Sequence, residues 1–190
     1  MNPYHNSLQK RLLDIFLSVL IFPIAFPLLL LSIILILVFN GTPAFYIQER
    51  VGKDGVRFNM YKLRTMKHKF KNRGGTIHQD KDITRIGRLL RITRMDEVPQ
   101  ILNILKGEMS WVGPRPEVPF YVDIYLEKDE KYNLRHAVLP GITGLAQVEY
   151  PNATPNENLD KLSYDLEYVE KASLQMDIRL FLASFFAVFK

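Results

Sequence analysis

The feature that most constrains this chain is an apolar run near its N-terminus. From Ile15 to Phe39 no side chain is ionisable. At 1.5 Å of rise per residue, a helix of this length can cross a hydrocarbon core of roughly 30 Å. We therefore expect a membrane helix. A cleaved signal peptide is disfavoured, because its apolar region is usually only about 7 to 15 residues long.

Two prolines, Pro23 and Pro27, interrupt the apolar run. Each removes a backbone donor and favours a bend. A sharp bend would leave two arms too short to span the bilayer, so that the segment enters and leaves through one leaflet; a straight, mildly kinked span is the alternative with equal weight. Basic residues near both ends predict that both ends face the cytoplasm: Lys10, Arg11, Arg50, Lys53 and Arg57.

Charge and length suggest how the rest of the chain is organised. We expect residues 1–40 to be membrane-embedded and residues 41–190 to form one cytosol-facing domain. Lysine and arginine total 25 against 20 acids, which favours anionic partners such as nucleic acid, nucleotide phosphates or acidic lipid. The chain has no cysteine, so disulfides and thiolate metal sites are excluded.

The patterning of residues 41–190 predicts a helix-rich α+β fold. Residues 44–66 have the pattern of two strands joined by Gly52–Gly55, and Asp54-Gly55 is a strong hairpin signal. A Pro-Gly turn in residues 136–150 precedes an expected short strand. Helical periodicity or apolar content marks residues 85–94, 100–105, 159–169 and 178–189. We predict a re-entrant membrane helix, a short β-hairpin and amphipathic interfacial helices around a compact domain.

Two basic segments suggest contact with an anionic surface. Residues 67–82 have the composition of a basic loop that either touches acidic lipid or stays solvated, with Lys67, Lys69, Lys71 and Arg73. The helix expected at 85–94 alternates apolar residues with four arginines. Such a run is often only a solvated face, but four arginines without an acid repel one another unless anions are near.

Asp96 and Glu97 are the strongest candidates for chemistry. They fall at the expected start of the helix 100–105, where amide donors and partial positive charge favour phosphate oxygens. A carboxylate can attack phosphorus or hold a divalent ion. On a helix the two side chains diverge by about 100°, so their roles should differ. Simple helix capping is the common alternative for such a pair.

Three cations could complete a phosphate site. Lys62 and Arg64 share one face of the expected second strand, and Arg115 is held between Pro114 and Pro116. These cations could neutralise a pyrophosphate while a carboxylate holds a metal. The sequence has no Walker loop and no His-Glu-x-x-His motif, and its four histidines lack ligand spacing. Asn152-Ala153-Thr154 is a weak match to a glycosylation acceptor.

Taken together, these motifs resemble the bacterial sugar transferase family of small monotopic phosphoglycosyl transferases. The resemblance covers nearly the whole chain and rests on six blocks in order: Lys10–Asp14, Gln48–Gly52, Tyr61–Met66, Asp96–Gln100, Gly113–Pro116 and Pro140–Val148. It implies an enzyme of the cytoplasmic membrane of bacteria with a catalytic domain on the cytosolic face. The family's Ser-Pro helix break is here Phe26-Pro27, with Ser18 and Ser32 as the nearby hydroxyls.

The resemblance also implies a mechanism. Asp96 would attack the sugar-bearing phosphate of a UDP-sugar and expel UMP, and the resulting phosphosugar enzyme would pass its group to a polyprenol phosphate such as undecaprenyl phosphate. This would be the first membrane step of glycan assembly, in an exopolysaccharide, O-antigen, capsule or glycoprotein pathway. Mg²⁺ would be held by Asp96 and Glu97, and Lys62, Arg64 and Arg115 would bind phosphates.

Two other functions remain as alternatives. A non-catalytic, membrane-anchored adaptor would bind acidic lipid or protein through the basic surfaces, and Asp96 would then be dispensable. Nucleic-acid binding fits the charge but lacks a recognisable module, so we expect no nucleic-acid partner. The sequence leaves open the sugar, the pathway and whether the chain forms a homodimer.

Overall fold

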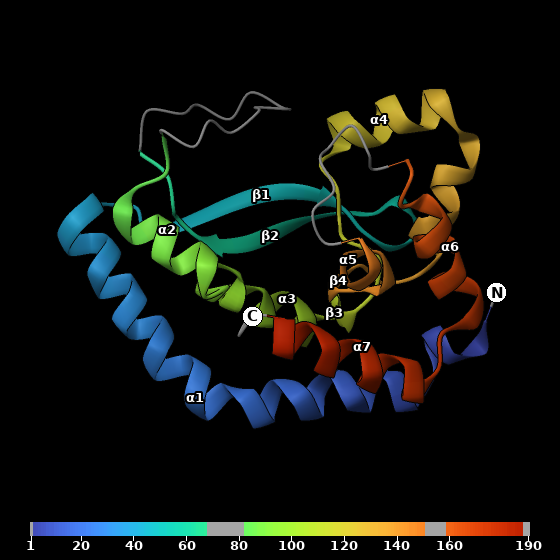
Figure 1. Cartoon of the computed structure of the whole chain (residues 1–190), viewed down its shortest axis with the longest axis horizontal. Coiled ribbons are helices and arrows are strands. Elements are labelled where there is room, and N and C mark those ends of the chain that lie inside the picture. Colours follow the sequence, from blue (N-terminus) through green and yellow to red (C-terminus); the bar gives the residue numbers. More distant parts are fainter. Residues whose placement is uncertain (1, 68–81, 151–158, 188–190) are drawn as a thin grey trace.

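The computed structural model describes residues 2–67, 82–150 and 159–187. Its first long element is the helix α1 (Leu8–Asn40) of 33 residues, which follows a 3₁₀ turn at Pro3–Asn6. Among the described residues, α1 alone is long and apolar enough to cross a membrane. Figure 1 shows that α1 bends between two arms, and both prolines lie inside the helix. The predicted helix and its bend are therefore confirmed.

The two serines near the proline break, Ser18 and Ser32, do not bond to the carbonyl that it frees. A proline leaves the carbonyl four residues before it without a donor, which points to Val19 for Pro23. The hydroxyl of Ser18 instead donates to the Asp14 carbonyl over 2.7 Å, and that of Ser32 donates to the Leu28 carbonyl over 2.7 Å. Both bonds are ordinary back-bonds within the helix.

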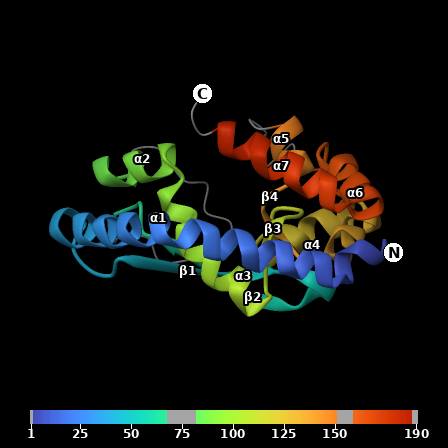
Figure 2. The same ribbon diagram turned by 90° about the horizontal axis from the view of Figure 1, so that it is seen from below.

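The predicted β-hairpin is confirmed. Strands β1 (Phe45–Val51) and β2 (Arg57–Leu63) pair antiparallel around the turn at Lys53–Gly55. Asp54 has a positive φ of 55° in this turn, as the Asp-Gly signal implies. The hairpin lies on one side of α1 and the C-terminal helix α7 (Leu174–Ala187) on the other (Figure 2).

A second, parallel strand pair was not predicted. Strand β3 (Ser110–Val112) pairs with β4 (Gly141–Thr143), and a Cβ on Gly141 would clash with the backbone of Gly113. The short strand expected in residues 136–150 is thus confirmed at Gly141–Thr143, although Leu145–Glu149 forms the helix α5. Glycine is required here because the two backbones are in contact.

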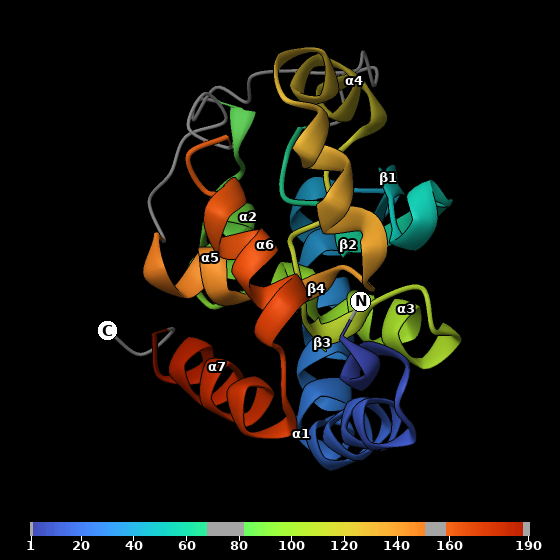
Figure 3. The ribbon, with the colours of Figure 1, turned by 90° about the vertical axis from the view of Figure 1, so that its right-hand side faces the viewer.

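The remaining elements are helical. They are α2 (Arg85–Ile92), a 3₁₀ helix η4 (Met95–Gln100), α3 (Ile101–Lys106), α4 (Pro119–Lys128), a 3₁₀ helix η5 (Glu130–Ala137) and α6 (Leu162–Lys171). Three of the predicted helices correspond to α2, α3 and α6, and the apolar segment expected at 178–189 overlaps α7. Figure 3 shows the first arm of α1 and α7 together at the lower end of the view.

The core extends into the long apolar helix α1. Leu17 and Ala25 of α1 pack with Ile104, Trp111 and Leu180 in one buried cluster. The middle of α1 is nevertheless exposed, with Ile24 at 70%. Apolar side chains of neighbouring helices are also exposed, namely Leu89, Ile92, Leu102, Leu105, Ile178 and Leu182. This distribution suits helices that lie at a membrane interface.

Candidate active site

Asp96 and Glu97 lie in the 3₁₀ helix η4 rather than at the cap of an α-helix. Arg94, with a positive φ of 58°, reverses the chain after α2, and η4 then leads directly into α3. Pro99 lies inside η4 and has no amide proton, so it cannot donate a regular α-helical hydrogen bond. Both carboxylates are buried, with 8% exposure each.

Glu97 is the centre of an ion cluster. Its Oε1 accepts from Lys62 Nζ over 2.8 Å and from Arg115 Nη2 over 2.7 Å. Burial alone would raise the pKa of Glu97, but the charges and hydrogen bonds of Arg115 and Lys62 outweigh it and hold the pKa well below its usual range. Glu97 is therefore an anchored anion that fixes two cations.

Asp96 has a different environment. Its pKa is raised, first by burial and then by the charge of Glu97, against the opposing charges of Lys62 and Arg91. No side chain among the described residues donates a hydrogen bond to its carboxylate. A buried carboxylate without a dedicated cation is a stronger nucleophile and metal ligand than one already bound.

Two of the three cations predicted to bind phosphates lie at the carboxylate pair, and their binding of phosphate stays a prediction. Lys62 and Arg115 lie at the carboxylate pair, and Arg115 keeps 40% of its side chain exposed. The buried Arg64 instead donates to the carbonyls of Asn40 over 2.6 Å and Thr42 over 2.8 Å. It thereby stabilises the carbonyl end of α1. Its predicted role at a phosphate stays a prediction.

Sequence patterns did not reveal two further arginines near the site. Arg50 of β1 donates to the Pro116 carbonyl over 2.9 Å, and Arg135 of η5 donates to the Arg115 carbonyl over 2.7 Å. Both hold the backbone on which Arg115 stands. Neither arginine forms a local sequence pattern with Arg115. Only their position in or near the motifs of the family resemblance could have drawn attention to them.

The residues at the site fit magnesium only in part. Among the described residues no three His, Cys, Asp or Glu side chains gather as a metal cage. Mg²⁺ commonly uses one or two carboxylates and completes its shell with substrate phosphates and water. Asp96 suits that pattern, whereas Oε1 of Glu97 is already bound by two cations.

Two predicted segments lie outside the described residues. They are most of the basic loop 67–82, including Lys69, Lys71 and Arg73, and the tripeptide Asn152-Ala153-Thr154. The arginines of α2 are described, and Arg91 Nε donates to the Thr65 hydroxyl over 3.0 Å. This bond fixes α2 next to β2, so at least Arg91 of its basic face is in contact with the rest of the fold.

Comparison with known proteins identifies the family. The model of the bacterial sugar transferase family matches residues 5–190. The chain is 38% identical to the UDP-N-acetylgalactosamine-undecaprenyl-phosphate N-acetylgalactosaminephosphotransferase of Aeromonas hydrophila, over 89% of this chain and 41% of that protein. It is 37% identical to the UDP-glucose:undecaprenyl-phosphate glucose-1-phosphate transferase of Caulobacter vibrioides, over 93% of this chain and 68% of that protein.

A relative of similar size is the uncharacterised sugar transferase EpsL of Bacillus subtilis, which is 37% identical over 90% of this chain and 82% of its own length. The Aeromonas protein, in contrast, is more than twice as long as the region that matches. The family match spans α1, the hairpin and the ion cluster alike. This chain therefore belongs to the bacterial sugar transferase family, which places it among the sugar-phosphate transferases.

Proposed function

We propose that this chain transfers a sugar 1-phosphate from a UDP-sugar to undecaprenyl phosphate and releases UMP. The observation that carries the proposal is the unequal carboxylate pair: Glu97 is fixed by Lys62 and Arg115, while no side chain in the described part of the chain holds Asp96 in this way. The names of the Aeromonas and Caulobacter relatives describe the same class of transfer.

In the proposed first step, an Asp96 oxygen attacks the phosphorus that carries the sugar. The bond between this phosphorus and the oxygen bridging to the uridine phosphate breaks, and UMP leaves with the electron pair. Arg115 and Lys62 lie close enough to Asp96 for their charges to act on it, and they would balance the charge that develops on the phosphate oxygens. Bound Mg²⁺ would supply further positive charge at the phosphates, with Asp96 as its best-suited ligand.

In the second step, a phosphate oxygen of the polyprenol attacks the same phosphorus. The bond to Asp96 breaks, which regenerates the free carboxylate and releases a polyprenyl-diphosphate sugar. Because Glu97 stays bound to two cations throughout, it keeps them in place for both displacements. The lipid acceptor and the soluble donor must meet at the membrane interface, where the exposed apolar side chains of α2 and α7 suit a lipid surface.

The proposed activity is tested by UMP release. We would incubate the full chain in detergent or nanodiscs with Mg²⁺, undecaprenyl phosphate and a panel of UDP-sugars. We expect UMP with at least one donor and a lipid-linked sugar phosphate as the second product. No UMP from any UDP-sugar, with folded protein that still binds acidic vesicles, would favour the adaptor function instead.

The pH dependence of the reaction should report the charge of Glu97. Asp96 must be ionised to attack, and its pKa is raised partly by Glu97. Glu97→Gln removes that negative charge and releases the charges of Lys62 and Arg115, and both effects lower the pKa of Asp96. We therefore expect the acid limb of the kcat/KM profile to move to lower pH, whatever the loss of rate.

The matched control is Glu49→Gln, which removes a glutamate that is 52% exposed and paired with Arg57. Its acid limb should coincide with that of the unmodified chain. If the limb of Glu97→Gln stays in place or moves to higher pH, ionisation of Asp96 does not control the rate.

The geometry of α1 also supports a re-entrant membrane segment as part of this proposal. Near its start, Arg11 donates to the Ile104 carbonyl over 2.6 Å, and at its end Asn40 donates to Thr84 over 3.0 Å. Both ends of α1 are thus bonded to the same domain. A straight span would place them about 30 Å apart on opposite sides of the bilayer.

Cysteine labelling can test this topology directly, because the chain has no native cysteine. We would place single cysteines at the exposed positions Gln9 and Thr42, with Ile24→Cys as a lipid-facing control. An impermeant maleimide should label both Gln9→Cys and Thr42→Cys in inside-out vesicles and neither in intact cells. Labelling of one end from each side would establish a straight span.

A further inference from the structure

The loop that carries Arg115 is fixed at almost every backbone carbonyl. Five of the six carbonyls from Val112 to Glu117 accept a bond from another part of the fold. The donors are Lys10 Nζ at Val112 (2.8 Å), the Gly141 amide at Pro114 (2.9 Å), Arg135 at Arg115 (2.7 Å), Arg50 at Pro116 (2.9 Å) and the Val51 amide at Glu117 (2.9 Å). Four of these donors come from the domain, whereas Lys10 comes from α1.

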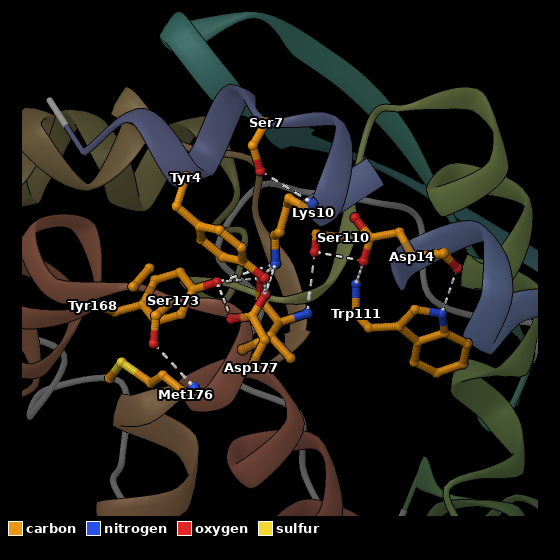
Figure 4. Close-up of polar contacts among 12 residues, drawn as sticks. Tyr4, Ser7, Lys10, Asp14, Ser110, Trp111, Tyr168, Ser173, Met176 and Asp177 are labelled. Atoms are coloured by element: carbon orange, nitrogen blue, oxygen red, sulfur yellow. Dashed lines mark hydrogen bonds and ion pairs between the residues drawn. The ribbon is translucent and has the colours of Figure 1, made fainter. Parts of the chain in front are cut away.

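Lys10 lies in a buried polar cluster that the proposed chemistry does not use (Figure 4). Its Nζ lies 2.5 Å from Asp177 Oδ2, and the two side chains are 5% and 0% exposed. Asp177 also accepts from Tyr4 over 2.8 Å and from Tyr168 over 2.7 Å. This cluster connects the start of α1 with α6 and α7.

Counting protons shows which side chain holds the Val112 carbonyl. Tyr168 Oη lies 2.9 Å from this carbonyl and 2.7 Å from Asp177 Oδ1, but a tyrosine hydroxyl has only one proton to donate. The charged acceptor is nearer and forms the stronger bond. Lys10 has three protons, and three acceptors surround it: Val112 O, Tyr168 Oη and Asp177 Oδ2. Lys10 is therefore the side chain that donates to the Val112 carbonyl.

We propose that Lys10 is a positioning residue for Arg115 in the transfer reaction, with Asp177 holding Lys10 in place. Lys10 fixes the carbonyl three residues before Arg115, and Arg115 in turn holds Glu97. Through the side chain of Lys10, α1 thus sets the position of Arg115 in addition to anchoring the domain. This inference rests on the proposed function, because it concerns the same reaction.

The test must avoid leaving a charge buried without its partner, because such a change costs about 3 to 5 kcal/mol and can prevent folding. The main variant is therefore the double substitution Lys10→Met with Asp177→Asn, which removes both charges together. Arg11→Met is the matched control. Arg11 is the neighbouring basic residue of α1, but it donates to the carbonyls of Ile104 and Leu105 rather than to Val112.

We would measure kcat and KM for the donor in the unmodified chain, in both variants, and in each combined with Arg115→Met. We expect the double variant to lose roughly tenfold to a hundredfold in kcat/KM, as for a misplaced catalytic group. In the Arg115→Met background it should cause no further loss, because its effect passes through Arg115. Arg11→Met should leave kcat/KM unchanged in both backgrounds.

Hydrogen exchange gives a readout that does not need activity. Peptides that contain Gly113, Arg115 and Glu117 should exchange faster in the double variant than in the unmodified chain. In Arg11→Met their exchange rate should be unchanged. Tyr168→Phe, which leaves the bond from Lys10 to Val112 intact, should change neither exchange in this loop nor kcat/KM by more than about twofold, because Lys10 remains the donor.

An additive loss in the Arg115→Met background, or unchanged exchange in Gly113–Glu117, would overturn the positioning role. If the unmodified chain releases no UMP from any donor, the proposed function fails, and the exchange measurement still decides whether Lys10 fixes the loop.

Discussion

Asp96→Asn should lower the rate of UMP release by roughly a thousandfold or more, as the loss of a nucleophile does in other covalent enzymes. The substitution keeps the shape of the side chain but removes the charge that attacks phosphorus. It also removes the group on which a phosphosugar would be carried. With a donor labelled in its sugar phosphate and no lipid acceptor, the unmodified chain should therefore acquire label, and Asp96→Asn should acquire none.

Asp54→Asn is a suitable control, since Asp54 is exposed in the hairpin turn and asparagine tolerates its positive φ of 55°. Its rate and labelling should equal those of the unmodified chain. If Asp96→Asn keeps most of the rate while labelling is lost, the transfer is a direct displacement rather than a two-step reaction. If it keeps both, Asp96 is dispensable, as the adaptor hypothesis predicts.

The largest effect on stability is expected for Asp165→Asn. Asp165 and Arg135 form a buried ion pair, with Arg135 Nε and Nη2 both 2.8 Å from Asp165 Oδ2 and side-chain exposures of 5% and 8%. Removing the carboxylate charge leaves the guanidinium buried without a counterion, which costs about 3 to 5 kcal/mol. Chemical unfolding in detergent, followed by tryptophan fluorescence, should show this loss.

Glu167→Gln is the control for this experiment because it removes a charged partner from the same helix α6. Glu167 pairs with Lys171 at the surface, where the two side chains are 45% and 64% exposed. The change should cost no more than about 0.5 kcal/mol, the usual value for exposed pairs four residues apart on a helix. Equal losses in the two variants would mean that the pair between Arg135 and Asp165 contributes no more than a surface ion pair.

The elements with strong local signals were predictable from sequence. The absence of charge from Ile15 to Phe39 indicated α1, the Asp54-Gly55 turn indicated the hairpin, and the apolar period of residues 85–94 indicated α2. Each depends on interactions between residues close in the chain. The parallel pair of β3 and β4 has strands of only three residues each, too short to produce an alternating pattern.

The site was predictable in its residue types but not in its contacts. Lys62 and Arg115 reach Glu97 across 35 and 18 positions of the chain, and no spacing rule connects such residues. Arg64 is a second example of a contact that local spacing does not predict. On a strand its spacing to Lys62 suggested a shared phosphate site, but it follows the last residue of β2, where the chain turns it toward the carbonyl end of α1. Local period cannot foresee such a long-range partner.

The bonded carbonyls of Val112–Glu117 also limit where the chain can change its length. An added or deleted residue in this loop would displace each following carbonyl from its donor, from Gly141 through Val51. Asp54 to Val56 in the hairpin turn are exposed instead, and such loop tips tolerate insertions best. An epitope tag or a fluorescent reporter therefore belongs in this turn, where it would not disturb the cations around Glu97.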